Sequence, residues 1–329
     1  MRIIALLVLA GVLLFAFALI QVAWPETATL PPRIFTQRSV FSGFWVSCCQ
    51  GGHIVMLGKV LTAQRNAPKL ANARPPVYYL PLWFQAIQNV SAIRSGIYLL
   101  PMVIPLIVST LVTGQLVSRI GYYTPFLIFG VCVASIGSGF LTTLEVNTSK
   151  SRWIGFQILY GFGLGCCAQA PNMAAQTVLP REDVATGASL MFFGQQVFGS
   201  IFTTVGQSAL DNQLTNYFAK FPNVTSEQIQ NTGATELLHL IPPEDHLAGL
   251  NAYNDSLRVS FRIALILACI SILGALFMEW RSVKKNLREE PTIVKGATEE
   301  EAPEHISDRE NRCKGEYKGG NSTAEMAMK

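Results

Sequence analysis

The chain has 329 residues, of which 50% are hydrophobic and 14% are charged, and its formal net charge is +4. Soluble domains carry roughly 25% charged residues, so this composition argues against a water-soluble enzyme. The positive charges gather at the ends of apolar stretches, as lipid topology requires, and they give no indication of nucleic-acid binding. The sequence therefore predicts the lipid bilayer as the first partner of the chain.

The apolar stretches predict an all-α membrane protein. Stretches of about 20 residues with few or no charges match the thickness of a bilayer core. The first stretch could instead be a cleaved signal peptide, but it is longer than the usual apolar region of such a peptide, and we prefer a transmembrane helix. About seven spans are predicted, roughly at residues 3–24, 40–57, 96–118, 124–143, 153–178, 185–209 and 257–280.

The second span is interrupted by Gly58–Pro76, a segment that carries four cations. A single cation at the centre of a bilayer costs roughly 2.5–3.5 kcal/mol on insertion scales, so the segment cannot lie in the membrane. Removing it would join Leu57 to Val77 in a smooth apolar span. Codons for Gly58-Lys59 and Pro76-Val77 can hold intron splice signals, and removal keeps the reading frame. We interpret the segment as a retained intron; a genuine re-entrant loop is the alternative.

Orientation follows from the cations, because cytoplasmic loops carry an excess of Lys and Arg. The basic cluster at residues 281–288 is placed in the cytoplasm, so the loops at 89–95, 144–152 and 210–256 lie on the other side. Those loops contain three Asn-x-Ser/Thr sequons, which are acceptors for N-glycosylation. The predicted glycosylation sites are Asn147, Asn223 and Asn254.

A short turn between the third and fourth spans carries a glycine- and arginine-containing motif at residues 114–123. Glycine permits a tight turn, and Arg119 can bond carbonyl groups at a helix end or a partner carboxylate. The turn resembles the G-x-x-x-[DS]-R-x-G-[RY] loop of major facilitator superfamily transporters. Alternatively, Arg119 is a plain positive-inside anchor. The motif positions are Gly114, Ser118, Arg119 and Gly121.

Further segments strengthen this resemblance, because they recur in the same order in fungal multidrug transporters of that superfamily. The resemblance covers roughly residues 1–280, except 58–76, and is to the fourteen-span drug:proton antiporters. It implies the C-terminal six-helix bundle of such a carrier, preceded by one linker span, with the N-terminal half missing. It also implies an amphipathic small-molecule substrate and protons as the coupling ion. The segments are 78–85, 95–101, 118–125, 153–157, 170–178, 182–187 and 191–195.

The fifth span has a small and polar face. Gly161 and Gly165 form a G-x-x-x-G pair, which we interpret as a helix-packing face and not as a nucleotide loop. Uncharged polar side chains avoid lipid, so we expect them, with aromatic residues of the sixth span, to line a substrate path. Hydrogen bonding between helices is the alternative. The predicted cavity residues are Gln157, Gln169, Asn172, Gln176, Phe192, Gln195 and Gln196.

Neither an acidic residue at a span centre nor a metal site is apparent. In the resembled family the coupling carboxylate generally lies in the N-terminal half. The histidines, including His53, are scattered, and the seven cysteines form no C-x-x-C pair. We therefore expect no metal, no cofactor and, without a nucleophile and base together, no enzymatic activity.

We divide the chain into a linker helix with a cytoplasmic loop (1–38), a six-helix bundle (39–280, with 58–76 as an insertion) and a disordered cytoplasmic tail (281–329). The expected protein is an integral multi-pass membrane protein, in the plasma membrane rather than the vacuole. Its expected function is part of a proton-coupled efflux carrier of hydrophobic small molecules or toxins, inactive alone. The alternative is a truncated membrane protein that transports nothing and acts through a partner.

Overall fold

The computed structural model describes Val12, Ala16, Leu19 and residues 32–58, 79–218 and 246–282. These residues are mostly helical and contain no β-strand, which confirms the predicted all-α class. Most of the predicted first span, the segment 59–78 and the chain after Ser282 lie outside the described residues.

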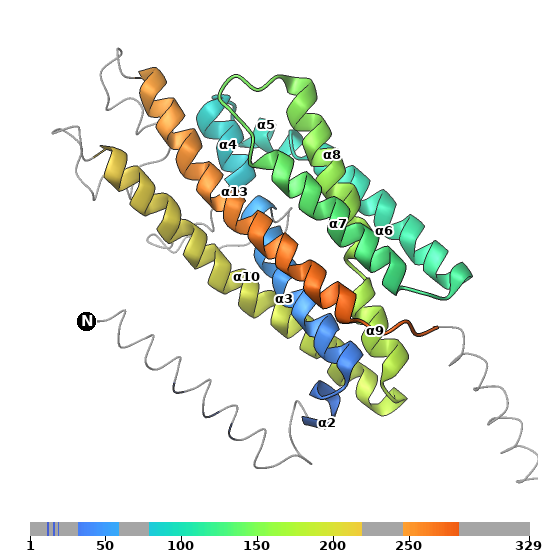
Figure 1. The fold of residues 1–329 in the computed structure, drawn as a ribbon. Helices are drawn as coiled ribbons and strands as arrows, with labels where there is room; N and C mark the ends of the chain where they lie inside the picture. The colour runs from blue at the N-terminus through green and yellow to red at the C-terminus, as the bar shows by residue number, and fades with distance from the viewer. Residues whose placement is uncertain are drawn as a thin grey trace, which may run out of the picture. The chain divides into compact units, whose positions relative to one another are not determined.

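Figure 1 shows the helices as a bundle of long, inclined rods. Four stretches are long and apolar enough to cross a bilayer, namely Arg38–Leu57, Ala92–Ile120, Thr124–Leu141 and His246–Phe277. The helices are α2 (Pro32–Phe35), α3 (Arg38–Gly58), α4 (Tyr79–Ile87), α5 (Ala92–Ile97), α6 (Leu100–Ile120), α7 (Thr124–Leu141), α8 (Lys150–Cys167), α9 (Ala170–Val178), α10 (Arg181–Phe218) and α13 (His246–Phe277).

Two predicted boundaries were wrong. Helix α10 continues to Phe218, and α13 begins at His246, so both ends of the predicted loop 210–256 are helical. Hydropathy misses such ends because helix turns outside the apolar layer carry polar residues on part of their surface. The fifth predicted span is divided into α8 and α9 at Ala168 and Gln169. Pro171 lies in the first turn of α9, where its missing N–H breaks no helical hydrogen bond.

The long helices pack together as a bundle (Figure 1). Helix α3 packs between α10 and α13, α13 packs on α7, α7 on α8, and α8 on α6. Helix α6 packs mainly on α8, and many of its large apolar side chains, such as Ile104, Val108 and Leu111, are exposed. An apolar exposed face on a membrane-spanning helix is suited to lipid or to another helix.

Glycine allows α8 to approach two helices at once. A Cβ added to Gly161 would overlap the carbonyl oxygen of Met102 on α6, and one added to Gly165 would overlap that of Leu106. On the other side, a Cβ at Gly163 would overlap the backbone of Ala134 on α7. The prediction that the G-x-x-x-G pair is a helix-packing face is therefore confirmed.

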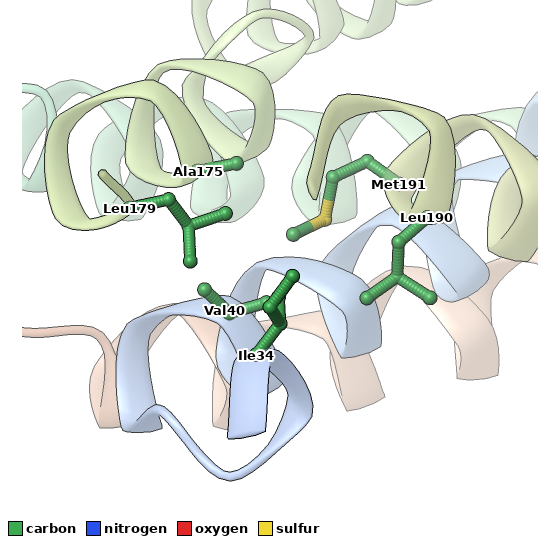
Figure 2. Close-up of a cluster of buried hydrophobic side chains, with 6 residues drawn as sticks. All are labelled: Ile34, Val40, Ala175, Leu179, Leu190 and Met191. Atoms are coloured by element: carbon green, nitrogen blue, oxygen red, sulfur yellow. The ribbon is translucent and has the colours of Figure 1, made fainter. Parts of the chain in front are cut away.

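A cluster of apolar side chains holds the start of α3 against α9 and α10 (Figure 2). Its members come from α2, α3, α9 and α10 and from the turn after α9, so burial of apolar surface joins segments far apart in the sequence. The buried members are Ile34, Val40, Ala175, Leu179, Leu190 and Met191.

Candidate functional site

The predicted cavity residues differ in exposure. Gln157 is fully buried, whereas Gln169, Gln176 and Gln196 are exposed. Two features lie between the polar residues of the fifth span. The break at residues 168–169 separates α8 from α9, and the glycine positions between the polar residues are closed by α6. Asn172 and Gln195 are partly buried, and Phe192 is 56% exposed.

The inner face of α8 is buried along its whole length. Gln157 lies on this face between Trp153 and Tyr160, and no hydrogen bond to its side-chain amide is found in the described residues. A buried polar group without a partner costs about 1–3 kcal/mol. Such a group needs a water, a ligand or a change of conformation to be satisfied.

Beside Gln157, the structure brings together a titratable pair that sequence reasoning missed. His53 of α3 is 2% exposed, and its Nδ1 lies 2.7 Å from the hydroxyl of Tyr160 on α8. One turn before His53 on α3, the amide of Gln50 donates to the carbonyl of Cys167 at 3.2 Å. The available signal was a histidine inside a predicted span, which is rare enough to suggest a role.

A second missed group is Asp211, because the sixth span was predicted to end near residue 209. Asp211 lies within α10, where the amide of Gln207 donates to its carboxylate at 2.9 Å. Asp211 also lies near the phenols of Tyr79 and Tyr253, which come from α4 and α13. A carboxylate therefore lies where three helices meet. No three metal-ligating side chains gather anywhere in the described part of the chain.

Gly114 and Gln169 share a small hollow between α6, α7 and the α8–α9 break. Thr110, Tyr123 and Met173 also line it. Its volume is about 10 Å³, which is enough for about one water molecule. The hollow is therefore too small for an organic substrate, but it shows that the predicted turn motif and one predicted cavity residue are neighbours.

The motif turn between α6 and α7 is fixed by its last glycine. Gly121 ends α6 with φ of 92°, a left-handed conformation that glycine adopts without strain. The hydroxyl of Ser118 donates to the carbonyl of Gly114 at 3.0 Å. A Cβ on Gly114 would meet nothing within 4 Å, so this glycine is not needed for packing inside the described bundle.

The last residues of the motif and Thr124, directly after it, attach the turn to the end of α13. The hydroxyl of Thr124 donates to the carbonyl of Glu279 at 3.0 Å, and Tyr122 forms a bridge with Ser282. Burial raises the pKa of the Tyr123 phenol above its ordinary value, with Ser39 and Arg281 acting in the opposite direction. The starts of α3 and α7 and the end of α13 therefore meet at this side of the bundle.

Charged groups reinforce this side. Arg33 forms an ion pair with Asp183 in the first turn of α10, at 2.9 Å, where a carboxylate also favours the positive end of the helix dipole. Arg38 donates to the carbonyl of Phe277 at the end of α13.

The predicted glycosylation sites differ in accessibility. Asn147 is exposed in the turn between α7 and α8, and Asn223 lies outside the described residues. Asn254 is 3% exposed; its Oδ1 accepts from the indole of Trp83 at 2.7 Å, and its amide donates to Leu144 at 3.1 Å. A glycan would require this amide to leave the core, so the folded structure argues against Asn254 as an acceptor.

Comparison with known proteins gives the family. No protein-family model matches the chain. It is 40% identical over 283 residues to the MFS-type transporter VdtG of Byssochlamys spectabilis, a match covering 86% of this chain and 48% of the relative. An MFS-type transporter of Claviceps purpurea is 40% identical over 304 residues, covering 92% and 49%. The efflux pump roqT of Penicillium rubens is 37% identical over 297 residues, covering 90% and 52%.

The chain thus spans about half the length of the curated relatives it matches. Those relatives are transporters and efflux pumps and not enzymes, and the described helices include four apolar enough to cross a membrane. The chain therefore belongs to the major facilitator superfamily of membrane transporters, and it corresponds to about half of such a protein.

Proposed function

We propose that the chain is the C-terminal half of an efflux carrier that moves amphipathic small molecules out of the cytoplasm in exchange for protons. The observation that carries this proposal is its 37–40% identity to MFS-type transporters and an efflux pump over 86–92% of its length. Transporters of this kind hold substrate between two bundles. Because the chain spans about half of its relatives, we propose that it needs an N-terminal half to transport.

The exposed aromatic and amide side chains of α10 support a role in the substrate cavity. Phe192 is 56% exposed and Gln196 is exposed one turn further along. An aromatic ring combined with an amide suits a broad range of organic compounds. Gln169 and Gln176 add exposed amides on the α9 side. Gln157 is a different case, since it is buried within the bundle.

Efflux of a fluorescent lipophilic dye from cells tests the proposal. Three strains are compared: one with the chain alone, one with the chain and the N-terminal half of the Penicillium rubens relative, and one with neither. We expect dye export only from the paired strain, and its loss when a protonophore collapses the proton gradient. Equal export by the chain alone and the pair would contradict the need for a second half.

Two substitutions separate a cavity role from a structural one. Phe192→Ala and Gln196→Ala in the paired protein should raise the dye concentration needed for half-maximal export by severalfold while leaving the melting temperature unchanged, because both side chains are exposed. Gln157→Leu serves as the contrast, because this side chain is buried and its replacement should change the melting temperature. Unchanged dye dependence in both variants would remove α10 from the cavity.

We propose His53 and Asp211 as the candidate groups for coupling export to proton movement. Both are titratable and lie within helices, and each has a defined polar partner. His53→Gln and Asp211→Asn should leave dye binding intact but weaken the dependence of export on the proton gradient. If neither changes that dependence, the coupling group lies outside these two positions.

The half-length match also supports the alternative, a membrane protein that transports nothing and regulates a partner. In that case the paired strain would export no dye, and the chain would alter the activity of an intact transporter expressed beside it.

For localisation we propose the plasma membrane, which microscopy of a fluorescent fusion would distinguish from the vacuole.

A further inference from the structure

We infer that α3 and α4 are two parts of a single membrane-spanning helix, and that residues 58–76 are an insertion within it. Three neighbouring helices make contacts with both parts, and these contacts give the order and spacing of the two parts. The continuity of the helix is a matter of folding and does not depend on the proposed transport.

Helix α4 runs in the same direction as α3. Along α3, Arg38 bonds Phe277 and Trp45 bonds Ile270, so α13 residue numbers fall as α3 numbers rise. Along α4, Tyr79 lies beside Ser260 and Trp83 bonds Asn254, which continues the same descent. In Figure 1, α4 lies beyond the C-terminal end of α3, and both helices pack on α13. A hairpin that returned toward its starting side would reverse this order.

Contacts with α13 show how many residues the chain uses between α3 and α4, compared with the advance along α13. Gly52 lies against Leu267, and Trp83 bonds Asn254. Helices that lie side by side rise by the same distance per residue, so equal advances are expected along both. Between these two contacts α13 advances by about 13 residues and the chain by about 31 residues. The chain therefore has about 18 residues more than the common helical rise requires.

Helix α10 gives a similar excess. Val55 lies against Gly199, and Tyr79 lies against Gly206. Between these contacts α10 advances by about 7 residues and the chain by about 24 residues, which is an excess of about 17 residues over equal helical rise.

Helix α8 gives a third value. Gln50 bonds Cys167, and the ring of Phe84 contacts that of Trp153. Between these contacts α8 advances by about 14 residues and the chain by about 34 residues, an excess of about 20 residues. The values from the three neighbours lie on either side of the length of segment 58–76.

Helical phase gives a further check. Met56 and Tyr79 both cover Gly206 of α10. Without residues 58–76 these two side chains would be at positions i and i+4, which lie on the same face of a helix. Arg38–Leu57, Val77, Tyr78 and α4 would then form one continuous helix, similar in length to α13 with its 32 residues.

The ends of the two parts are buried rather than exposed. Met56 and Leu57 at the end of α3, and Tyr79 and Leu80 at the start of α4, are each 0% exposed. Loops normally leave a fold at its surface, and a helix end inside a membrane protein leaves backbone groups that need partners. A continuous helix would satisfy these groups internally.

A deletion series in the purified chain tests the inference. The variants lack residues 58–76, 58–75 or 58–77, and their thermal unfolding in detergent is compared. Only the variant without 58–76 is expected to melt several degrees above the unaltered chain. One residue more or less rotates α4 by about 100° and moves Trp83 away from Asn254. Any ranking in which the deletion of 58–76 is not the most stable would overturn the inference.

A matched variant shows that the gain arises from α4 docking in phase. In the chain without 58–76, Asn254→Ala should lower the melting temperature about as much as in the unaltered chain, because Trp83 loses its acceptor in both. In the chains without 58–75 or 58–77 the same substitution should cost less, because the rotated Trp83 no longer meets Asn254. If Asn254→Ala lowers the melting temperature of all three deletion variants equally, α4 does not dock in phase after removal of 58–76, and the inference fails.

The proposed origin as a retained intron has its own test. Sequencing transcripts across codons 57–77 should find molecules without the segment. Uniform retention in every transcript would remove the intron explanation and leave an encoded insertion.

Discussion

At the scale of single residues, special backbone and buried polar positions do most to fix the bundle. Gly121 ends α6 in a left-handed conformation that only glycine adopts readily. Asn254 joins the indole of Trp83 on α4 to the Leu144 carbonyl after α7. These two positions have consequences that mutagenesis can measure.

Gly121 and Gly114 provide a matched pair within the motif. Gly121→Ala should lower stability by about 1–2 kcal/mol, the usual cost of a left-handed conformation for a residue with a Cβ. Gly114→Ala should be close to neutral or slightly stabilising, because its Cβ would enter open space. Thermal unfolding in detergent distinguishes them, and equal effects would contradict the assigned roles.

Asn254→Ala should destabilise the bundle by about 1–3 kcal/mol, because it leaves the buried Trp83 donor without an acceptor. A double-mutant cycle with Trp83→Phe checks the cause, since the loss in the double variant should be smaller than the two single losses added together. Asn254→Gln should leave gel mobility unchanged. A faster-migrating band would show that the buried asparagine carries a glycan after all.

At the scale of elements, glycine spacing in α8 decides which helices pack together. Gly161 and Gly165 meet α6, whereas Gly163 meets α7. Small residues let backbones approach closely, and this closeness drives association when lipid offers no hydrophobic gain. The buried face of α8 carries Gln157 and Tyr160, so its close packing also positions the polar groups.

Gly161→Ala tests this packing against Gly155→Ala on the same helix. The first substitution should lower stability by about 1–3 kcal/mol, as overpacking usually does, because the new Cβ overlaps the Met102 carbonyl. The second meets nothing within 4 Å and should be neutral or gain up to about 1 kcal/mol from helix propensity. Similar melting temperatures for the two variants would exclude α6 as the partner of this face.

At the scale of the whole molecule, the bundle is anchored at the side where α3 begins. Arg33 pairs with Asp183, Arg38 bonds the end of α13, and Thr124 bonds Glu279. Surface ion pairs are individually weak, about 0–1 kcal/mol, so the apolar cluster in Figure 2 supplies most of the attachment.

The chain should remain in the membrane pellet after washing with alkaline carbonate, because four described stretches are long and apolar enough to span a bilayer. A peripheral protein, held by charge alone, is released by this treatment and serves as the control. Release of the chain into the supernatant would contradict its assignment as an integral membrane protein.

Most of the fold was predictable, but much of the site was not. Span positions follow from hydropathy, which depends only on composition along the chain. The end of α10 and the start of α13 could not be found from hydropathy, because the outer turns of these helices are polar on part of their surface. The same error placed Asp211 in a loop. The exposure of the predicted cavity residues was not predictable either, because it depends on which helices cover Gln157 and leave Gln169 open.

The sequence by itself determined that this is an all-α membrane protein of the major facilitator type, since apolar length and motif order do not require knowledge of contacts. It also indicated that residues 58–76 do not belong to a membrane span, because four cations cannot enter lipid. Only the tertiary structure could show that His53 meets Tyr160 and that Asn254 is buried, because these facts depend on which helices face each other. The tertiary structure also supplied the contacts from which we propose the length of an insertion there, since neighbouring helices rise by the same distance per residue.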